Sequence, residues 1–415
     1  MRYGTMMVAA LATVIGTGQL SAANPPATAA RALTPAETAQ AVVKGSNQFM
    51  CDLYAKLAAR QDDVFFSPYA MSSALALLER GARGKTDEEL RAALHLPRQD
   101  ETVNAVCSEV AAEMQAEKQG YRLAVANGIW TQQGEPFQPA FLNDATKVFH
   151  AGLEALNFIA DTEPSRAKIN AWISGQTADK IKELLPAGAV TRDSRLVVTS
   201  AVYFKGTWAC KFKKTATLKE DFHLATRKTV KTELMHQSES FNYASDDNCQ
   251  VVELPYKGAE LAMLVLLPVK TDLDCQKLEA GLNADYIRGA IDQLGHRPVI
   301  LTLPKWKFGQ SYDMTPPLQE LGITQAFDDK ADFSGINGRK ELRVSAVVHR
   351  ADIDVNEEFT EATAGTAVVS GAAGGVGAPE PPVVFRADRP FVYLIYHRVN
   401  RTVLFMGRLT NPTAK

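Results

Sequence analysis

The feature that most constrains the fold of this chain is a long uncharged segment close to its C-terminus. Residues 362–377 carry no charge and consist mainly of Ala, Gly, Val and Thr, a composition typical of a flexible loop or linker. After this segment only two strand-like runs remain, at residues 391–397 and 402–409. Two strands cannot bury a core of their own. They must therefore pair with the domain that precedes the segment.

The segment is then a long loop inside one domain, and loops of this length are uncommon unless they serve a function. The chain has 415 residues, and a hydrophobic content of 46% is enough for a large core. Helical patterns dominate up to about residue 190, and strand-like runs follow, which favours an α+β architecture. These runs are residues 196–204, 261–267 and 299–303.

The first helix is predicted to begin at a capping box made by Thr34 and Glu37, with Pro35 at the first helical position. Apolar side chains then recur every four residues and predict a face that packs against the core. These side chains are Phe49, Leu53 and Leu57, with Met50 and Tyr54 beside them.

A second helix is predicted over residues 70–79, and Thr86 with Glu89 predicts a further capping box after it. The string GARGKT lies between them and superficially resembles a phosphate-binding loop. That loop needs a glycine five residues before Gly84, where this chain has Glu79. We therefore expect no nucleotide site.

No pattern of an enzyme active site is present, since the chain lacks GxSxG, HExxH and a GxGxxG after a strand. His349 lies in a strand-like run at residues 346–355, where a hydrogen-bonded core histidine is the default and a catalytic base the minority interpretation. An odd number of widely spaced cysteines argues against a disulfide framework and a metal site, although one pair could still bridge after export. We expect buried thiols at Cys51, Cys107, Cys210, Cys249 and Cys275.

The N-terminus has the pattern of a secretory signal peptide over residues 1–23, with Arg2, an apolar stretch and small residues before the cleavage point. An Ala/Pro-rich tether over residues 24–37 and one domain over residues 38–415 would follow, in a secreted protein of the extracellular space or periplasm. The net charge of −2 gives no broad attraction to nucleic acid or anionic membrane. One basic cluster could bind a sulfated polysaccharide, or could be a solvated face. It comprises Lys205, Lys211, Lys213, Lys214 and Lys219.

From about residue 38 to Pro412 the chain resembles the serpins, a family of protease inhibitors. The string DVFFSPYAMSSALALLERGARGKTDEEL at residues 63–90 is similar to the second helix of the family and the loop after it. INAWISGQTADKIKELL at 169–185 and VVTSAVYFKGTW at 197–208 are similar to the helix over the main sheet and the next central strand. VELPYKG, LPKWKF and DFSGI also match, as does the tail RPFVYLIYHRVNRTVLFMGRLTNP.

The resemblance implies an α+β serpin fold with three β-sheets, eight or nine helices and an exposed reactive-centre loop at about residues 357–385. In that family a protease cleaves the loop and forms an acyl-enzyme, and the loop then inserts into the main sheet of a metastable fold and traps the enzyme. The expected protein is a monomer that can form loop–sheet polymers, with no cofactor and no catalytic or metal site. The resemblance places the sheet-opening region at Ser67, Ser200, His349 and Trp208. It places the hinge of the loop at Glu357, Glu358, Phe359, Thr360, Glu361, Ala362, Thr363 and Ala364.

The loop has the residues that insertion requires. A loop that becomes a central strand must bury every second side chain, so those side chains must be small and uncharged. A proline among them would remove a hydrogen-bond donor. The buried set would be Thr360, Ala362, Ala364, Thr366, Val368 and Ser370. The opposite face would carry Glu361, Thr363, Gly365, Ala367 and Val369.

Three features differ from the usual pattern of the family. Phe359 stands where glycine is common, Ala70 and Ser200 replace a usual Ser and Asn, and the loop before Pro390 is several residues longer. The family's usual count from Glu357 puts the scissile bond at Ala373-Gly374, within the interval from Ala372 to Pro379. Counting back from Pro390 gives Ala378-Pro379 instead, but a bond followed by proline is poorly cleaved.

A small residue such as Ala373 suits a protease with a shallow apolar pocket, of the elastase-like or subtilisin-like kind. Trypsin-like targets are not expected, since no Arg or Lys lies between Thr360 and Phe385. The sequence thus predicts an inhibitor of serine or cysteine proteases. The alternative is a non-inhibitory serpin that acts as a binding or carrier protein, to which Phe359 and the long loop point.

Overall fold

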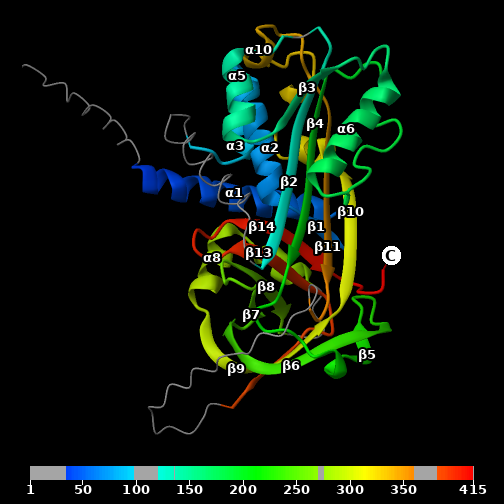
Figure 1. Cartoon of the computed structure of the whole chain (residues 1–415). Helices are drawn as coiled ribbons and strands as arrows, with labels where there is room; N and C mark the ends of the chain where they lie inside the picture. Colours follow the sequence, from blue (N-terminus) through cyan, green and yellow to red (C-terminus); the bar gives the residue numbers. More distant parts are fainter. Residues whose placement is uncertain (1–33, 98–119, 135, 270–274, 359–380, 415) are drawn as a thin grey trace, which may run out of the picture.

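The computed structural model of this chain (Figure 1) shows an α+β protein with two hydrogen-bonded sheets. The predicted signal peptide, Cys107 and the loop from Phe359 to Glu380 lie outside the residues that the structure describes. No helix in the described part of the chain is long and apolar enough to cross a bilayer. The described residues are 34–97, 120–134, 136–269, 275–358 and 381–414.

One sheet has five strands, and two of its inner strands, β11 and β4, run parallel to each other. Antiparallel pairs flank them on both sides, β10 with β11 and β2 with β4. The predicted strands at 196–204 and 346–355 are confirmed with slightly longer bounds. In sheet order, the strands are β10 (Trp306–Asp313), β11 (Val344–Val355), β4 (Leu196–Gly206), β2 (Tyr121–Gln132) and β3 (Gly152–Leu156).

The other sheet is a network of nine strands, which joins two of the three expected sheets. The join is β6, a single strand of 17 residues whose first part pairs with β5 and whose last part pairs with β7. The order is β1 (Val64–Phe66), β14 (Val403–Leu409), β13 (Phe391–His397), β8 (Leu261–Pro268), β7 (Cys249–Pro255), β6 (Thr229–Ser245), β9 (Gly295–Pro304) and β12 (Val383–Arg386), with β5 (Leu218–His223) beside β6.

The C-terminal strands confirm that the tail belongs to the preceding domain. β13 pairs with β8, and β14 pairs with both β13 and β1. All seven residues of each of these two strands are buried. The pair is thus part of the core that the earlier strands form.

The described residues form nine α-helices, and the first begins as predicted. The Thr34 side chain accepts from the backbone of Glu37 and the Glu37 carboxylate accepts from the backbone of Thr34, which completes the capping box. The helices are α1 (Pro35–Ala58), α2 (Pro68–Gly81), α3 (Gly84–Ala93), α5 (Pro139–Asn143), α6 (Thr162–Gln176), α7 (Gln276–Gly281), α8 (Ala284–Asp292), α9 (Thr315–Glu320) and α10 (Ser334–Asn337).

Two predictions near α2 and α3 need correction. Helix α2 begins two residues before Ala70, because the Ser67 hydroxyl caps it and Pro68 occupies its first turn. The expected capping box of Thr86 and Glu89 is wrong, since α3 already begins at Gly84. The two side chains bond elsewhere: Thr86 accepts from the backbone of Asp332, and Glu89 accepts from the backbone of Thr324 and Gln325.

Helix α6 covers one face of the five-stranded sheet (Figure 1). Its Trp172 meets Trp130 of β2 edge-to-face with ring centroids 5.3 Å apart, and Ile169 and Ile173 are fully buried there. On the other face, α2 packs against β2 and β4 of this sheet and against β14 of the second sheet. In a strand added to the five-stranded sheet, the side chains that point toward α2 would therefore be buried.

Candidate functional site

The candidate site is the junction between the parallel strands β4 and β11. Paired residues run from Leu196 opposite Val344 to Tyr203 opposite Asp352. Beyond that point β4 continues to Gly206 and β11 to Val355 without pairing to each other. The junction is thus closed along most of its length and parted at the end from which the loop leaves.

At the middle of the junction, the His349 ring joins three elements. Its Nε2 accepts a hydrogen bond from the backbone N–H of Ser67 at 3.0 Å, so its proton must be on Nδ1. Nδ1 lies 3.1 Å from the Ser200 hydroxyl, to which it donates. Ser200 and His349 are directly paired across the two strands. Separating β4 from β11 would therefore break this hydrogen bond directly.

The same cluster ties the junction to α2 and the second sheet. The Ser67 hydroxyl donates to the backbone carbonyl of Leu404 on β14 at 2.7 Å and accepts from the N–H of Ala70. Asn127 on β2 donates to the carbonyl of Ala70 at 3.1 Å. Ala70 has no side-chain hydroxyl, unlike the Ser that the family usually has at this position. It thus takes part in the cluster through its backbone N–H and carbonyl groups.

The His349 ring is neutral, because complete burial lowers its pKa to about 3. His349 and Ser200 superficially resemble a catalytic pair, but both are fully buried. His349 also donates to the Ser200 hydroxyl, whereas a general base would have to accept its proton. The geometry is that of a structural hydrogen bond, as expected for a core histidine.

At the parted end, the hinge backbone is held by aromatic residues after β4. The Trp208 indole N–H donates to the carbonyl of Asn356 at 2.9 Å, and the Trp208 ring stacks on Tyr256. The backbone N–H of Phe212 donates to the carbonyl of Glu357 at 3.1 Å. Trp208 therefore lies at the parted end of the junction, apart from the His349 cluster.

The carboxylate of Glu357, at the start of the hinge, is buried and bonded to two side chains. It accepts from the Thr217 hydroxyl at 2.8 Å and lies 3.3 Å from Lys305 Nζ, which also pairs with Glu233 at 3.2 Å. Burial alone would raise the pKa of Glu357, but Thr217 and Lys305 outweigh it and hold the pKa below its usual value. Glu357 is therefore ionised and fixed at neutral pH.

Glu358 forms a more exposed contact with the basic cluster. Lys214 Nζ lies 2.7 Å from its carboxylate and lowers its pKa. Lys214 lies in a short 3-10 turn, Lys214–Ala216, between β4 and β5. Lys211, Lys213 and Lys219 are exposed, whereas Lys205 on β4 is half-buried.

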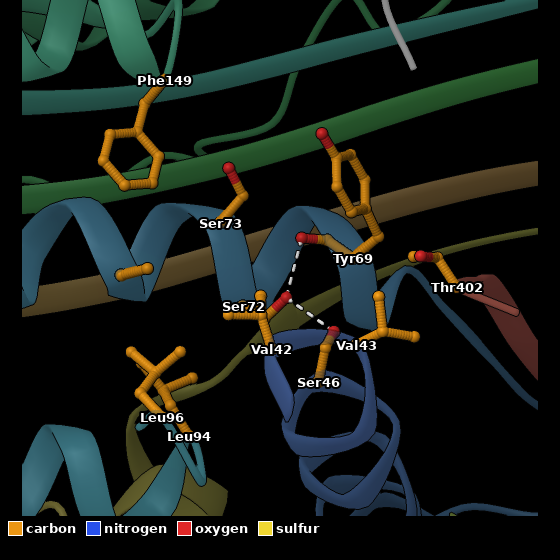
Figure 2. Close-up of a pocket in the computed structure, with 11 residues that line it drawn as sticks. Val42, Val43, Ser46, Tyr69, Ser72, Ser73, Leu94, Leu96, Phe149 and Thr402 are labelled. Carbon is orange, nitrogen blue, oxygen red and sulfur yellow. Dashed lines mark hydrogen bonds between the residues drawn. The ribbon is translucent and has the colours of Figure 1, made fainter. Parts of the chain in front are cut away.

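A small cavity between α1 and α2 offers no catalytic group (Figure 2). It measures about 60 Å³, and its described lining has no acidic, basic or cysteine side chain. Ser46 and Ser72 form a hydrogen bond there at 3.1 Å, and the buried Thr402 hydroxyl has no hydrogen-bond partner. Among the described residues, no group of three His, Cys, Asp or Glu side chains could hold a metal ion.

Comparison with known proteins identifies the family. The model of the family "Serpin (serine protease inhibitor)" matches residues 44–412. The chain belongs to the serpin family. Members of this family are mostly protease inhibitors rather than enzymes.

Named relatives cover nearly the whole serpin domain. An uncharacterised serpin-like protein of Thermococcus kodakarensis is 36% identical, over 89% of this chain and 86% of that protein. The leukocyte elastase inhibitor of Bos taurus is 36% identical, over 88% of this chain and 98% of that inhibitor.

Solved structures agree in fold. Uncleaved ovalbumin has a TM-score of 0.81 and 27% identity, and native protease nexin-1 with heparin has a TM-score of 0.80 and 27% identity. Each comparison covers 90% of this chain and 100% of the other. The predicted α+β serpin fold is therefore confirmed.

In this serpin the predicted site residues form two groups along one junction. Ser67, Ser200 and His349 form the central cluster, and Trp208 lies with Glu357 and Glu358 at the parted end. The predicted reactive bond Ala373-Gly374 lies outside the described residues. So do the other predicted hinge residues, Phe359, Thr360, Glu361, Ala362, Thr363 and Ala364.

Four contact residues were missed by the sequence analysis: Lys305, Thr217, Lys214 and Asn127. Lys214 was noted only as part of a basic cluster, and Lys305 only within the string LPKWKF. The cysteine prediction needs one correction. Cys51, Cys249 and Cys275 are buried as expected, but Cys210 is exposed, because it lies in the connection after β4.

Proposed function

We propose that this serpin inhibits serine endopeptidases as a suicide substrate and extends to cysteine proteases of similar specificity. One observation carries the proposal: β4 and β11 are direct parallel neighbours, and their junction is parted where β11 passes into the loop. A cleaved loop that turns back after Glu358 would enter between them, antiparallel to both. One parallel junction would then be replaced by two antiparallel ones, which are slightly more stable per residue.

The contacts of the junction would oppose insertion of the loop in the intact chain. The pair of Ser200 and His349 holds the strands together at the centre. Glu357, bonded to Thr217 and Lys305, holds the hinge at the parted end. An uncleaved loop is also anchored at its far end by β12, which pairs with β9. Cleavage would separate the arm that follows Glu358 from this anchor on β12. Insertion of the arm would therefore become possible only after the protease has cut the loop.

The chemistry follows from the bait bond. The protease nucleophile would attack the carbonyl carbon of Ala373, an ester or thioester would form, and the amine of Gly374 would leave. If the arm inserts before the acyl-enzyme bond is hydrolysed, insertion would pull the active site of the protease out of the geometry that hydrolysis needs. The small side chain of Ala373 favours an elastase-like or subtilisin-like enzyme, and the name of the bovine relative, leukocyte elastase inhibitor, agrees with that target class.

The experiment is to incubate the serpin with pancreatic elastase and with subtilisin. We expect a complex that survives denaturing electrophoresis and a cleaved serpin that melts at a higher temperature than the intact one. Thr360→Arg should abolish the complex but not cleavage, because a charge would enter the buried face of the sheet. Thr363→Arg, on the opposite face of the arm, is the matched control and should retain trapping. A Thr360→Arg protein that traps enzyme like wild type would refute insertion.

The alternative is a non-inhibitory serpin that binds or carries a ligand. Phe359 at the hinge favours it, and the apolar cavity with the Thr402 hydroxyl supplies a pocket. In that case elastase would cleave the loop without any gain in melting temperature. Export of the protein also remains a proposal, which N-terminal sequencing of the mature chain would test at Ala23.

A further inference from the structure

The outer face of β9 and β12 carries a contiguous apolar patch. Ile300 and Val384 are paired across these two strands, so their side chains lie on the same face, and they are 40% and 58% exposed. Pro298, two residues before Ile300, is exposed on that face as well. Single exposed apolar side chains are common on a protein surface, but adjacent ones mark interaction sites. We call these three residues the β9–β12 patch.

The opposite face of the same strands is firmly packed. Val299, Leu301 and Phe385 are fully buried in the core of the second sheet. The apolar residues of the patch are thus not needed to complete that core. The backbone of the patch is also held rigidly, because the opposite face of its two strands is packed in the core.

The surroundings of the patch are polar. On β6, Ser238 lies opposite Ile300 and Ser240 lies opposite Pro298, and both serines are exposed. On β12, Arg386 pairs with Glu220 and Asp388. An apolar centre with a polar and charged border is the usual composition of a protein–protein interface.

The patch lies next to the end of the bait loop. Strand β12 begins at Val383, directly after Pro381 and Pro382, which are exposed. Proline fixes its own backbone angle φ, so this exit from the loop is stiff. The patch and the loop are therefore joined by a short connection with little freedom.

Chain length brings any bound protease close to the patch. The bond Ala373-Gly374 precedes Val384 by about ten residues, which span at most about 35 Å. A protease domain of about 230 residues has a radius of gyration of about 17 Å and so measures about 45 Å across. A protease that holds this bond therefore has its active-site cleft within about 35 Å of the patch, which is less than the width of the enzyme, so the rim of the cleft can reach the patch. A bond at Ala378-Pro379 would bring it closer still.

We propose that the β9–β12 patch is a second contact surface for the target protease and binds an apolar loop at the edge of that enzyme's active-site cleft. The proposal rests on the proposed inhibitory function. Many proteases accept a small residue such as Ala373, so the bait bond alone discriminates poorly among them. A contact outside the bait loop adds affinity for those enzymes whose surface fits it.

The test compares the rate constant for association of the serpin with elastase and with subtilisin. The variants are Ile300→Thr, Val384→Thr and their combination, which keep the β-branched side chains that strands favour. Val399→Thr is the matched control, because Val399 is 80% exposed in the turn after β13. A synthetic peptide of residues 358–382, which carries the bait bond without the patch, gives the rate of cleavage by each enzyme alone.

We expect the double variant to associate about tenfold more slowly with at least one of the two enzymes, as loss of two apolar contacts predicts. The control should keep the wild-type rate, and intact and cleaved variants should keep wild-type melting temperatures. If wild type forms normal complexes and the double variant associates at the wild-type rate, the proposed role of the patch is refuted and the inhibitory function is not. Altered self-association without a change in rate overturns it too, in favour of a second copy of the chain as the partner. If wild type forms no complex, the inhibitory function fails first and this proposal with it.

Discussion

Ser200 on β4 and His349 on β11 lie directly opposite each other, and the Ser200 hydroxyl is 3.1 Å from His349 Nδ1. Both residues are fully buried, so water cannot replace either partner when the other is lost. This hydrogen bond crosses the junction that an inserting loop would have to part. It thus contributes to the stability of the intact fold and resists insertion at the same time.

Ser200→Ala should lower the stability of the intact protein. The substitution leaves the Nδ1–H of His349 buried without an acceptor, which costs about 1–3 kcal/mol of unfolding free energy. The measurement is the midpoint of denaturation by urea. Ser238→Ala, an exposed serine on β6, is the control and should change stability by less than about 0.5 kcal/mol. Equal losses in both variants would show that the buried hydrogen bond has no special weight.

Stability should fall in acid because of His349. Burial lowers its pKa to about 3 in the folded protein, whereas in the unfolded chain the pKa is about 6.5. Between these values the unfolded state binds the extra proton, so the contribution is intact above about pH 6.5 and declines by up to about 1.4 kcal/mol per pH unit below it.

The variant His349→Gln isolates this contribution, because glutamine does not titrate. Denaturation midpoints of wild type and variant should be compared from about pH 7.5 down to about pH 4.5. The advantage of wild type over the variant should shrink steadily as the pH falls. An advantage that stays constant with pH would contradict the assignment.

Lys214→Ala should loosen the hinge. Lys214 pairs with Glu358, two residues before Thr360, which would enter the sheet first. Because the pair is exposed, the effect on rates should be modest, on the order of two- to fourfold. The readout is the number of serpin molecules consumed per enzyme trapped, which falls when insertion is faster. Lys213→Ala, its exposed neighbour, should leave this number unchanged, and high salt should abolish the difference between them.

The sequence predicted the elements of this fold better than their contacts. The strand at residues 391–397 was predicted with its observed bounds, and the pairing of the tail with the preceding domain followed from its shortness. Strand β2 already lies at Tyr121–Gln132, so strands are not confined to the second half of the chain. Thr86 and Glu89 have the spacing of a capping box, but they bond to residues about 240 positions away. No local pattern encodes such partners.

In the candidate site too, the sequence indicated residues but not the contacts that they make. Ser67, His349 and Glu357 followed from the resemblance of short strings, whereas the partners of Glu357 did not. Thr217 is 140 positions before Glu357, and it reaches the hinge only because the connection after β4 folds back beside the end of β11. Such contacts depend on the register of β4 and β11 and on the path of one connection. Both are properties of the folded chain.

Glu79→Gln should stabilise the protein in mildly alkaline solution. Glu79 on α2 is buried, and burial together with a hydrogen bond that protonated Glu79 donates to Asp87 holds its pKa well above the usual value, although Arg80 and Arg91 act in the opposite direction. The folded state therefore keeps a proton that the unfolded chain has lost, and stability declines as the pH rises from about 4.5 through the raised pKa. Glutamine is neutral at every pH and avoids this decline.

The gain of Glu79→Gln should be near zero at about pH 4 and on the order of 1–3 kcal/mol at about pH 8, as denaturation midpoints would show. Glu89→Gln on α3 is the contrasting control. Its carboxylate accepts hydrogen bonds from the backbone of Thr324 and Gln325, which lower its pKa against the effect of burial. That variant should lose stability at about pH 8, because the ionised form is the one that the fold binds. A Glu79→Gln protein no more stable than wild type at that pH would mean that Glu79 is ionised in the folded state.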